Sequence, residues 1–377
     1  MSVATRRFFP EGPSGGVRRE LKRGTQFGDG APPFVNERAP IRVGIVGAGK
    51  MGLSHFAIAN GLPGASVVAV CDTSRYVRSV LRKYAGVQTY GEADEMVTDA
   101  QVDCLIVATP TSTHFAVAKQ ALQRGLHVFV EKPLTLSPAE SRSLADLALE
   151  RKRINQVGFH NRFIGTFQEA RRLIRAGALG TPSNVHGSAF GQVVVKEQSS
   201  TWRSKKSEGG GCLHDYACHV VNLMDFLVGS PARVSGARMQ RIFSTDVEDA
   251  VSAVFDYGTM TGILETNWSD DTVRKMSTTV TVHGSQGKLV VDRQELKLFL
   301  RDGCAFESYA EGWTSRYITE LQKPVPFYLR GEEYSAQLEA FFQAIRTADM
   351  GHENSFASSY ETDRVLDLIK RADSLVN

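Results

Sequence analysis

The sequence predicts an α/β protein with two domains: an N-terminal doubly wound parallel sheet, then an α+β domain with an open, mostly antiparallel sheet. Up to about residue 160, short apolar segments alternate with helical ones, a pattern typical of βαβ units. Beyond that point, segments with strand character follow one another directly, as in antiparallel sheets. A length of 377 residues accommodates two domains, each with a sizeable core.

The first domain is assigned to residues 41–160, where four segments are short, apolar and rich in β-branched residues. These predicted strands lie at residues 41–46, 66–71, 105–108 and 127–130. Helical segments are predicted from the glycine-rich turn to Asn60 and at residues 75–84, 92–98 and 113–124. Parallel sheets of this kind bind ligands at the carboxyl ends of their strands.

A glycine-rich turn, Gly47-Ala-Gly-Lys-Met-Gly52, leaves the first strand and opens the first helix. Gly47 permits the tight turn, Gly49 lets the backbone approach a pyrophosphate, and Gly52 allows close packing of helix and strand. The free N–H groups at the start of the helix then face the phosphates. Asp72 closes the second strand. It follows the glycine-rich turn at close to the separation of about 20 residues expected for a ribose-binding carboxylate. The sequence therefore predicts a dinucleotide-binding Rossmann domain.

The choice of cofactor depends on Asp72 and Arg75. A carboxylate at the end of the second strand accepts hydrogen bonds from ribose hydroxyls and repels a 2′-phosphate, which favours NAD over NADP. Arg75 follows three residues later and is the residue that would hold a phosphate if the cofactor were NADP. We expect NAD.

Glu131-Lys132-Pro133 follows directly on the strand at 127–130. Proline disfavours helical backbone at the preceding residue, so Lys132 is expected in an extended conformation at the carboxyl edge of the sheet. That edge is where the nicotinamide end of a dinucleotide lies.

A second polar segment begins with three glycines at 209–211 and continues as a predicted helix. Asp215 and His219 are four residues apart and share one helix face. From this spacing we predict that Asp215 orients His219 or binds a neighbouring hydroxyl, and that His219 exchanges a proton with a substrate hydroxyl. Two alternatives remain: a core helix with satisfied polar groups, or a metal site. The metal site would use Cys212, His214, Cys218 and His219.

The second domain is assigned to residues 161–377. Strands are expected at residues 185–190, 234–242, 250–255, 259–266, 277–282 and 288–291. Helical periodicity returns at 334–347 and 360–375, and these terminal helices are expected to pack near the domain junction.

Composition and charge exclude several classes of protein. The formal net charge is +3, and this excess lies within residues 1–40, so the remainder is balanced and lacks the basic character of a nucleic-acid binder. No apolar run approaches the ~20 residues of a membrane span. Five cysteines without tight spacing indicate reduced thiols and a cytoplasmic location. Residues 1–40, rich in Gly, Pro and Arg, predict a flexible N-terminal extension, and Arg6-Arg7 lacks the apolar region of an export signal.

The chain resembles the Gfo/Idh/MocA oxidoreductases over about residues 41–377. The resemblance rests on the glycine turn, Cys71-Asp72, Glu131-Lys132-Pro133 and three further motifs. These are Ala108-Thr-Pro-Thr-Ser-Thr-His114, Val157-Gly-Phe-His-Asn-Arg-Phe163 and Gly209-Gly-Gly-x-x-x-Asp215-x-x-x-His219. Asn222 departs from the family pattern, in which Asp is common at that position.

The resemblance implies a site composed of three sets of residues. The catalytic set is Lys132, Asp215 and His219. The cofactor set is Gly47, Gly49, Lys50, Met51, Gly52, Asp72, Arg75, Thr109, Pro110, His114, Glu131 and Lys132. Substrate contacts are expected from Lys132, His160, Arg162, Trp202, Arg203, Asp215 and His219. No metal ion is expected.

The activity implied is NAD(P)-dependent oxidation of a secondary alcohol, or reduction of the ketone. The substrate would be a sugar, sugar conjugate, nucleoside or cyclitol, with Lys132 and His219 as the acid–base pair. By the same resemblance the chain is expected to form a homodimer or homotetramer through its antiparallel sheet. Two alternatives exist within the family: an NAD-retaining glycosidase that oxidises its sugar transiently, and a non-catalytic NAD-binding sensor.

Overall fold

The computed structural model describes residues 39–196 and 201–374. Of the predicted N-terminal extension, residues 1–38 lie outside the described residues. The first element of the described residues is the strand that begins at Ile41, where the sequence predicts it.

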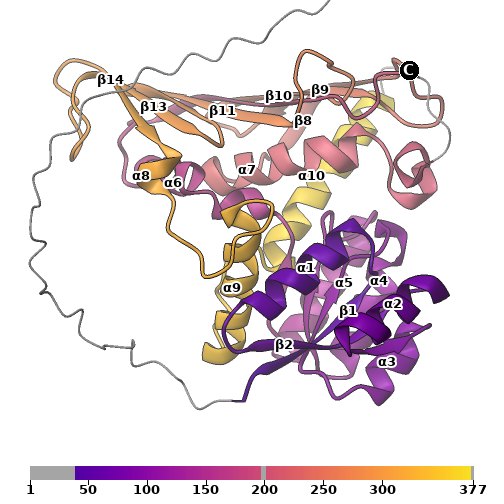
Figure 1. Cartoon of the computed structure of the whole chain (residues 1–377). Helices are drawn as coiled ribbons and strands as arrows, with labels where there is room; N and C mark the ends of the chain where they lie inside the picture. The colour runs from indigo at the N-terminus through magenta and orange to yellow at the C-terminus, as the bar shows by residue number, and fades with distance from the viewer. Residues whose placement is uncertain (1–38, 197–200, 375–377) are drawn as a thin grey trace, which may run out of the picture. The chain divides into compact units, whose positions relative to one another are not determined.

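A six-stranded parallel sheet forms the core of the first domain (Figure 1). Its strands are β1 Ile41–Val46, β2 Ala65–Cys71, β3 Gln88–Tyr90, β4 Cys104–Val107, β5 His127–Val130 and β6 Asn155–Val157. They lie in the order β3-β2-β1-β4-β5-β6. The chain reverses its direction across the sheet between β1 and β4, and ligands bind outside the carboxyl ends of the strands at such a point.

Five helices pack on this sheet, and local signals explain several of their ends. They are α1 Lys50–Gly61, α2 Arg75–Ala85, α3 Ala93–Asp99, α4 His114–Gln123 and α5 Pro138–Glu150. The Ser74 hydroxyl accepts a hydrogen bond from the Val77 amide and caps α2, which ends at Gly86 in the left-handed conformation. Pro138 is the first residue of α5, where its missing N–H costs nothing.

The second sheet has eight strands in the order β14-β13-β12-β11-β7-β10-β9-β8. They are β7 Pro182–Phe190, β8 Arg233–Gln240, β9 Ala250–Asp256, β10 Thr261–Asn267, β11 Ser277–Gly284, β12 Gly287–Val291, β13 Glu295–Leu300 and β14 Gly312–Tyr317. Every neighbouring pair is antiparallel except β7 and β10. The predicted fold class, a parallel doubly wound sheet followed by a mostly antiparallel one, is confirmed.

Helices cover one face of the eight-stranded sheet (Figure 1). α6 Gly165–Arg175, α7 Cys218–Val228 and α10 Phe356–Ser374 contact its strands, and side chains alternate between buried and more exposed along strands such as β9 and β10. α10 also packs against α5, and α9 Glu332–Thr347 packs against α1. The short α8 Ile318–Leu321 contacts α6 and β14. Both terminal helices therefore contact elements of the first domain.

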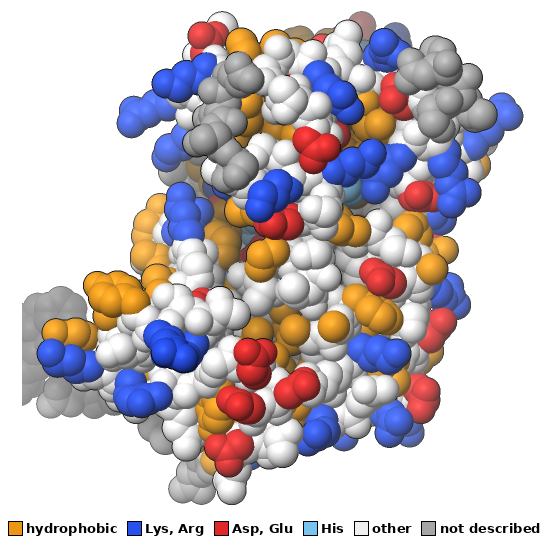
Figure 2. Space-filling model, turned by 90° about the vertical axis from the view of Figure 1, so that its right-hand side faces the viewer, with side chains coloured by type: hydrophobic (Ala, Val, Ile, Leu, Met, Phe, Trp, Pro, Cys, Tyr) orange, Lys and Arg blue, Asp and Glu red, His pale blue; other side chains and the backbone are white. Residues whose placement is uncertain are grey.

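The surface carries both signs of charge. On the face in Figure 2, Lys and Arg side chains are interspersed with Asp and Glu side chains and form no continuous field of one sign. Among residues 39–196 and 201–374, no helix has the length and apolar character needed to cross a membrane.

Candidate active site

A cleft of about 2130 Å³ runs from the glycine-rich turn to the second domain. Its lining includes the end of β2 and the segments that follow β4 and β5. The second domain contributes the segment around Trp202, the turn before α7, the β10–β11 loop and the start of α9. The carboxyl ends of the parallel strands and the polar segments of the second domain therefore face one space.

The glycine-rich turn has the geometry of a phosphate-binding loop. Gly47 has a φ of +92°, and a Cβ there would lie 2.8 Å from the Ala108 carbonyl oxygen. A Cβ on Gly52 would lie 1.8 Å from the Gly47 carbonyl oxygen, so only glycine fits. α1 begins at Lys50 with no side-chain cap and no acidic residue in its first turn. Its N–H groups are therefore available to an anion such as a pyrophosphate.

Asp72 lies at the end of β2 and lines the cleft. One carboxylate oxygen accepts a hydrogen bond from the Ala48 amide and the other from the Ser74 amide, both at 2.8 Å. These bonds fix the carboxylate and leave it further acceptor capacity for ribose hydroxyls. Arg75, in contrast, is exposed and is not among the lining residues. The arrangement fits a dinucleotide without a 2′-phosphate.

The His114 ring contacts the backbone of two loops at the cleft, one after β4 and one after β5. Thr109 and Pro110 line the cleft, whereas the His114 ring is buried behind them. Its Nδ1 lies 3.0 Å from the Pro133 carbonyl oxygen and its Nε2 lies 3.0 Å from the Thr109 carbonyl oxygen. Burial lowers the pKa of His114. The ring therefore connects the segment after β4 to the segment that carries Lys132.

Glu131 has a partner that the sequence analysis missed. Nε2 of His55, on α1, lies 2.6 Å from Glu131 Oε1, and the ring is fully buried. Burial alone would raise the pKa of Glu131, but the hydrogen bond with His55 and nearby positive charges lower it. The second carboxylate oxygen accepts a hydrogen bond from the Lys132 amide at 3.3 Å. Through Glu131, α1 is thus linked to the backbone of Lys132.

Lys132, Asp215 and Arg203 form an ion-pair triad in the cleft. Lys132 Nζ donates to Asp215 Oδ1 at 2.8 Å and to the Asp215 carbonyl oxygen at 3.1 Å. Arg203 Nε donates to Asp215 Oδ2 at 3.1 Å. Burial opposes the charge on Lys132, yet the ion pair with Asp215 raises the pKa of the amine. Burial likewise opposes ionisation of Asp215, but the two cations lower its pKa.

The orientation of His219 differs from the sequence prediction. Both Asp215 oxygens are occupied by cations, and within the described residues no hydrogen bond joins Asp215 to His219. His219 is 4 % exposed and lines the cleft, and its Nδ1 is buried without a hydrogen-bond partner. Burial and the positive charge of Lys132 hold the pKa of His219 well below its ordinary value. The ring is therefore a neutral imidazole beside a cationic amine.

The turn that carries Asp215 is not a regular α-helix. Residues Leu213–Ala217 form a π-helical turn that continues into α7. A π turn inserts one extra residue into the helix and changes which side chains share a face. Apolar spacing gives no signal for this change, which is why the sequence predicts a single uniform helix.

His160 packs against His219. Their ring centroids are 5.0 Å apart in an edge-to-face arrangement. The other side of His160 stacks on Tyr334 of α9, with centroids 4.4 Å apart. Burial and the nearby Arg293 lower the pKa of His160 to about 3. His160 therefore lines the cleft as a neutral ring packed between Tyr334 and His219.

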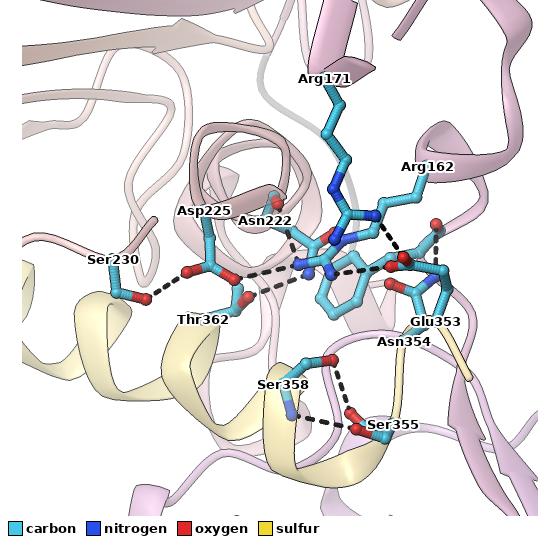
Figure 3. Close-up of polar contacts among 11 residues, drawn as sticks. Arg162, Arg171, Asn222, Asp225, Ser230, Glu353, Asn354, Ser355, Ser358 and Thr362 are labelled. Atoms are coloured by element: carbon cyan, nitrogen blue, oxygen red, sulfur yellow. Dashed lines mark hydrogen bonds and ion pairs between the residues drawn. The ribbon is translucent and has the colours of Figure 1, made fainter. Parts of the chain in front are cut away.

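Arg162 lies away from the cleft lining, in a buried polar network (Figure 3). Its Nε donates to Asn222 Oδ1 at 2.7 Å and its Nη2 donates to Asp225 Oδ2 at 3.1 Å. Glu353 lies between Arg162 and Arg171 and forms an ion pair with each. Asn222, which departs from the family pattern, thus supports the interior of the second domain, and we leave Arg162 out of the proposed substrate contacts.

Three of the four residues of the alternative metal site have other partners. Cys212 Sγ lies 3.5 Å from the Thr266 hydroxyl, Cys218 Sγ lies 2.9 Å from the His214 carbonyl oxygen, and His214 Nδ1 lies 3.3 Å from the Gly210 carbonyl oxygen. Among the described residues, no group of three or more His, Cys, Asp or Glu side chains is arranged to hold a metal ion.

Family models match both halves of the chain. Residues 41–159 match the model described as an oxidoreductase family with an NAD-binding Rossmann fold, and residues 167–290 match the GFO/IDH/MocA C-terminal domain. This chain is a Gfo/Idh/MocA oxidoreductase. The resemblance predicted from the motifs is confirmed, and with it the NAD-binding character of the first domain.

Proteins of known sequence are similar to the chain over different lengths. The NAD⁺-dependent scyllo-inositol 2-dehydrogenase of Bacillus subtilis is 31% identical over 192 residues, which are 50% of this chain and 54% of that protein. The match thus spans about half the length of that relative. The uncharacterised oxidoreductase YdgJ of Escherichia coli is 25% identical over 88% of this chain and 94% of its own.

Solved structures share the fold over nearly the whole chain. A levoglucosan dehydrogenase in complex with NADH and levoglucosan has a TM-score of 0.79 at 23% identity, covering 90% of this chain and 98% of that one. GenD2 from gentamicin A biosynthesis, in complex with NAD, has a TM-score of 0.75 at 25% identity, covering 92% and 98%.

Proposed function

We propose that this chain is an NAD-dependent dehydrogenase that oxidises a secondary alcohol of a sugar or cyclitol, or reduces the corresponding ketone. One observation carries the proposal: Lys132, Asp215 and His219 line the same cleft as the glycine-rich turn and Asp72. Family members named as scyllo-inositol, D-glucoside and levoglucosan dehydrogenases support this substrate class.

His219 is proposed to take the proton of the substrate hydroxyl. A general base must be unprotonated before it can act, and the lowered pKa of His219 keeps the ring neutral. His160 and Phe159 pack edge-on against the ring, with centroids 5.0 and 5.9 Å away. These contacts restrict its rotation, which preserves the orientation needed for proton transfer.

Lys132 is proposed to donate a hydrogen bond to the same oxygen. Its raised pKa keeps the amine charged, and a fixed positive charge stabilises the negative charge that develops on that oxygen as the proton leaves. Asp215 is proposed to hold the amine in place through its carboxylate and its backbone carbonyl. When bound, NAD supplies the hydride acceptor.

The remaining residues of the proposed site divide between cofactor and substrate. On the cofactor side, His114 is proposed to position the loop of Thr109 and Pro110, and Glu131 is proposed to position the adjoining loop that carries Lys132. On the substrate side, His160, Trp202 and Arg203 line the cleft near the triad. We further infer a cytoplasmic homo-oligomer, supported by five free cysteines and by the eight-stranded sheet, in which exposed residues alternate with buried ones along β9 and β10.

The proposal is tested by incubating the purified chain with NAD⁺ and a panel of sugars and cyclitols, and following NADH absorbance. The expected result is stoichiometric NADH formation with at least one member of the panel. His219→Gln should abolish it and the surface variant His283→Gln should not. If the chain binds NADH and cleaves glycosides but releases no NADH from NAD⁺, it is instead an NAD-retaining glycosidase. If it binds NADH and turns over no substrate, it is a sensor.

A further inference from the structure

We propose that Arg203, Arg274 and Lys275 form a subsite for an anionic group, a carboxylate or a phosphate, carried by the sugar substrate. This inference rests on the proposed function, because it names a chemical feature of the substrate for the same cleft. Three observations support it: a guanidinium with free donors, a pair of cations on an adjoining loop, and the balance of charge around them.

Arg203 is held in a fixed position with part of its hydrogen-bonding capacity unused. Its Nε is bonded to Asp215, and its guanidinium lies over the Trp202 ring, 4.6 Å from the centroid. Among the described residues, its Nη atoms have no partner. The side chain is 42% exposed and lines the cleft. A planar guanidinium with two free nitrogens is suited to a carboxylate or phosphate.

Arg274 and Lys275 lie on the loop between β10 and β11, and both line the cleft. This loop packs beside the triad: the Gln192 amide donates to the Arg274 carbonyl oxygen at 3.3 Å. A Cβ on Gly191 would meet both Met276 and the Tyr216 hydroxyl, so the segment after Lys275 passes next to the residue after Asp215. The two cations therefore border the substrate end of the cleft.

Neither cation is neutralised by the protein. Arg274 and Lys275 are not buried and have no ion-pair partner within residues 39–196 and 201–374. Asp270 and Asp271 share their loop but do not line the cleft, and Asp270 accepts hydrogen bonds from Thr272. Uncompensated cations around a concave site attract anionic ligands.

The other charged residues that line the substrate end of the cleft do not neutralise the positive charge of Arg203, Arg274 and Lys275. Asp215 is shared by two cations, Lys132 and Arg203, so the triad is itself positive. Arg293 and Glu333 neutralise one another. Asp292 accepts hydrogen bonds from two backbone amides, and Glu332, at the start of α9, follows Arg330 by two residues in the sequence, and both line the cleft. The substrate end of the cleft thus retains positive charge that a neutral sugar would not use.

The test measures binding rather than turnover, so that it is independent of the proposed reaction. The enzyme–NADH complex is titrated calorimetrically with two matched series: glucose, glucuronate and glucose 6-phosphate, and myo-inositol with its monophosphate. We expect at least one anionic member to bind about ten-fold more tightly than its neutral counterpart, with the advantage shrinking at high salt. A preference for glucuronate alone or for the phosphates alone identifies which anion the subsite takes.

The double variant Arg274→Gln/Lys275→Gln should remove this preference. The matched control, Lys119→Gln/Arg124→Gln, also removes two positive charges, but from in and beside α4 outside the cleft lining, and should retain it. The inference is overturned if neutral and anionic members bind equally to the wild type, if no anionic member binds, or if the preference survives in the double variant. Loss of NADH affinity in the double variant would also overturn it, because the cations would then serve the cofactor.

Failure of the proposed function has a different signature. In that case the anionic ligands still bind preferentially, but no member of the panel yields NADH.

Discussion

Lys132 Nζ lies 2.8 Å from Asp215 Oδ1, so the strand end of the first domain and the π turn of the second domain are joined by an ion pair inside the cleft. Only 16% of the lysine side chain and 10% of the aspartate side chain are exposed. A pair this well buried is costly to break, because the remaining charge has no water to solvate it. The pair therefore fixes both the position and the charge of Lys132.

Replacing Asp215 by Asn should expose the dependence of Lys132 on its partner. Without the carboxylate, burial dominates and the pKa of the amine falls from its raised value. Turnover should decrease at least about ten-fold, and the pH–rate profile should gain an alkaline limb at lower pH than in the wild type. An unchanged profile would show that Asp215 does not set the charge of Lys132.

The acid limb of the wild-type pH–rate profile should report His219. Its folded pKa lies below the ordinary value of 6.5, so the neutral ring persists and kcat/KM should remain constant as pH falls through 6.5, declining only below it. His219→Gln should lower kcat by about 100-fold or more while NADH affinity, measured by fluorescence titration, stays near the wild-type value. An acid limb centred at or above 6.5 would contradict this role.

His55→Phe should show whether the contact between His55 and Glu131 influences catalysis. The buried His55–Glu131 contact links α1 to the residue before Lys132, and its loss leaves a buried carboxylate without its main partner. We expect the pKa of Glu131 to rise and the pH–rate profile to shift. His55→Gln, which can still donate a hydrogen bond, should restore much of the wild-type behaviour. A purely structural role would lower thermal stability in both variants and leave the profile unmoved.

Asp363 on α10 should make stability depend on pH near neutrality. It is buried, accepts hydrogen bonds from Ser141 at 2.6 Å and from the Thr135 amide at 3.4 Å, and burial raises its pKa from 3.8 to about 7. The folded state binds the proton more tightly than the unfolded state. The contribution of Asp363 to the free energy of unfolding is therefore fully present below pH 3.8 and is lost as pH rises towards 7.

The measurement is thermal unfolding across this range. Asp363→Asn remains neutral at every pH, so its Tm relative to the wild type should increase from about pH 4 to about pH 8. A constant difference would show that Asp363 does not titrate in this window.

Arg162→Leu should destabilise the fold without disturbing the cleft. Arg162 is 4% exposed and binds Asn222 and Asp225 in the network of Figure 3. Removing one member of a buried ionic network costs about 3–5 kcal/mol, to be measured by urea unfolding. The KM for the sugar should change little at a temperature where the variant is folded. A large rise in KM would return Arg162 to the substrate set.

The cleft was largely predictable because its parts are encoded locally. Gly47, Asp72 and Lys132 each follow a strand that is recognisable from its own apolar residues, and parallel strands bring such ends to one edge. The glycines that precede Asp215 likewise mark that segment as one that approaches a ligand. The predicted strands at 41–46 and 127–130 match the structure to the residue.

Other features depend on partners that are distant in the sequence. His55 gains its role from Glu131, 76 residues away, and nothing in the spacing of α1 marks it. Arg162 follows a family motif, but Asn222, 60 residues away, turns its side chain inwards. β6 consists of Asn155, Gln156 and Val157, whose polar side chains are buried by tertiary contacts, so its composition does not predict a strand.

The π turn at Leu213–Ala217 has a consequence for variation in length. Such a turn holds one residue more than an α-helix of the same rise, so a single deletion there can be absorbed by reverting to ordinary helix. A deletion between Asp215 and His219 would reduce their separation from four residues to three and change the angle between their side chains about the helix axis. The Asp215 carboxylate would then no longer hold Lys132 in its present position relative to His219, and a protein with this deletion would keep its fold and lose its activity.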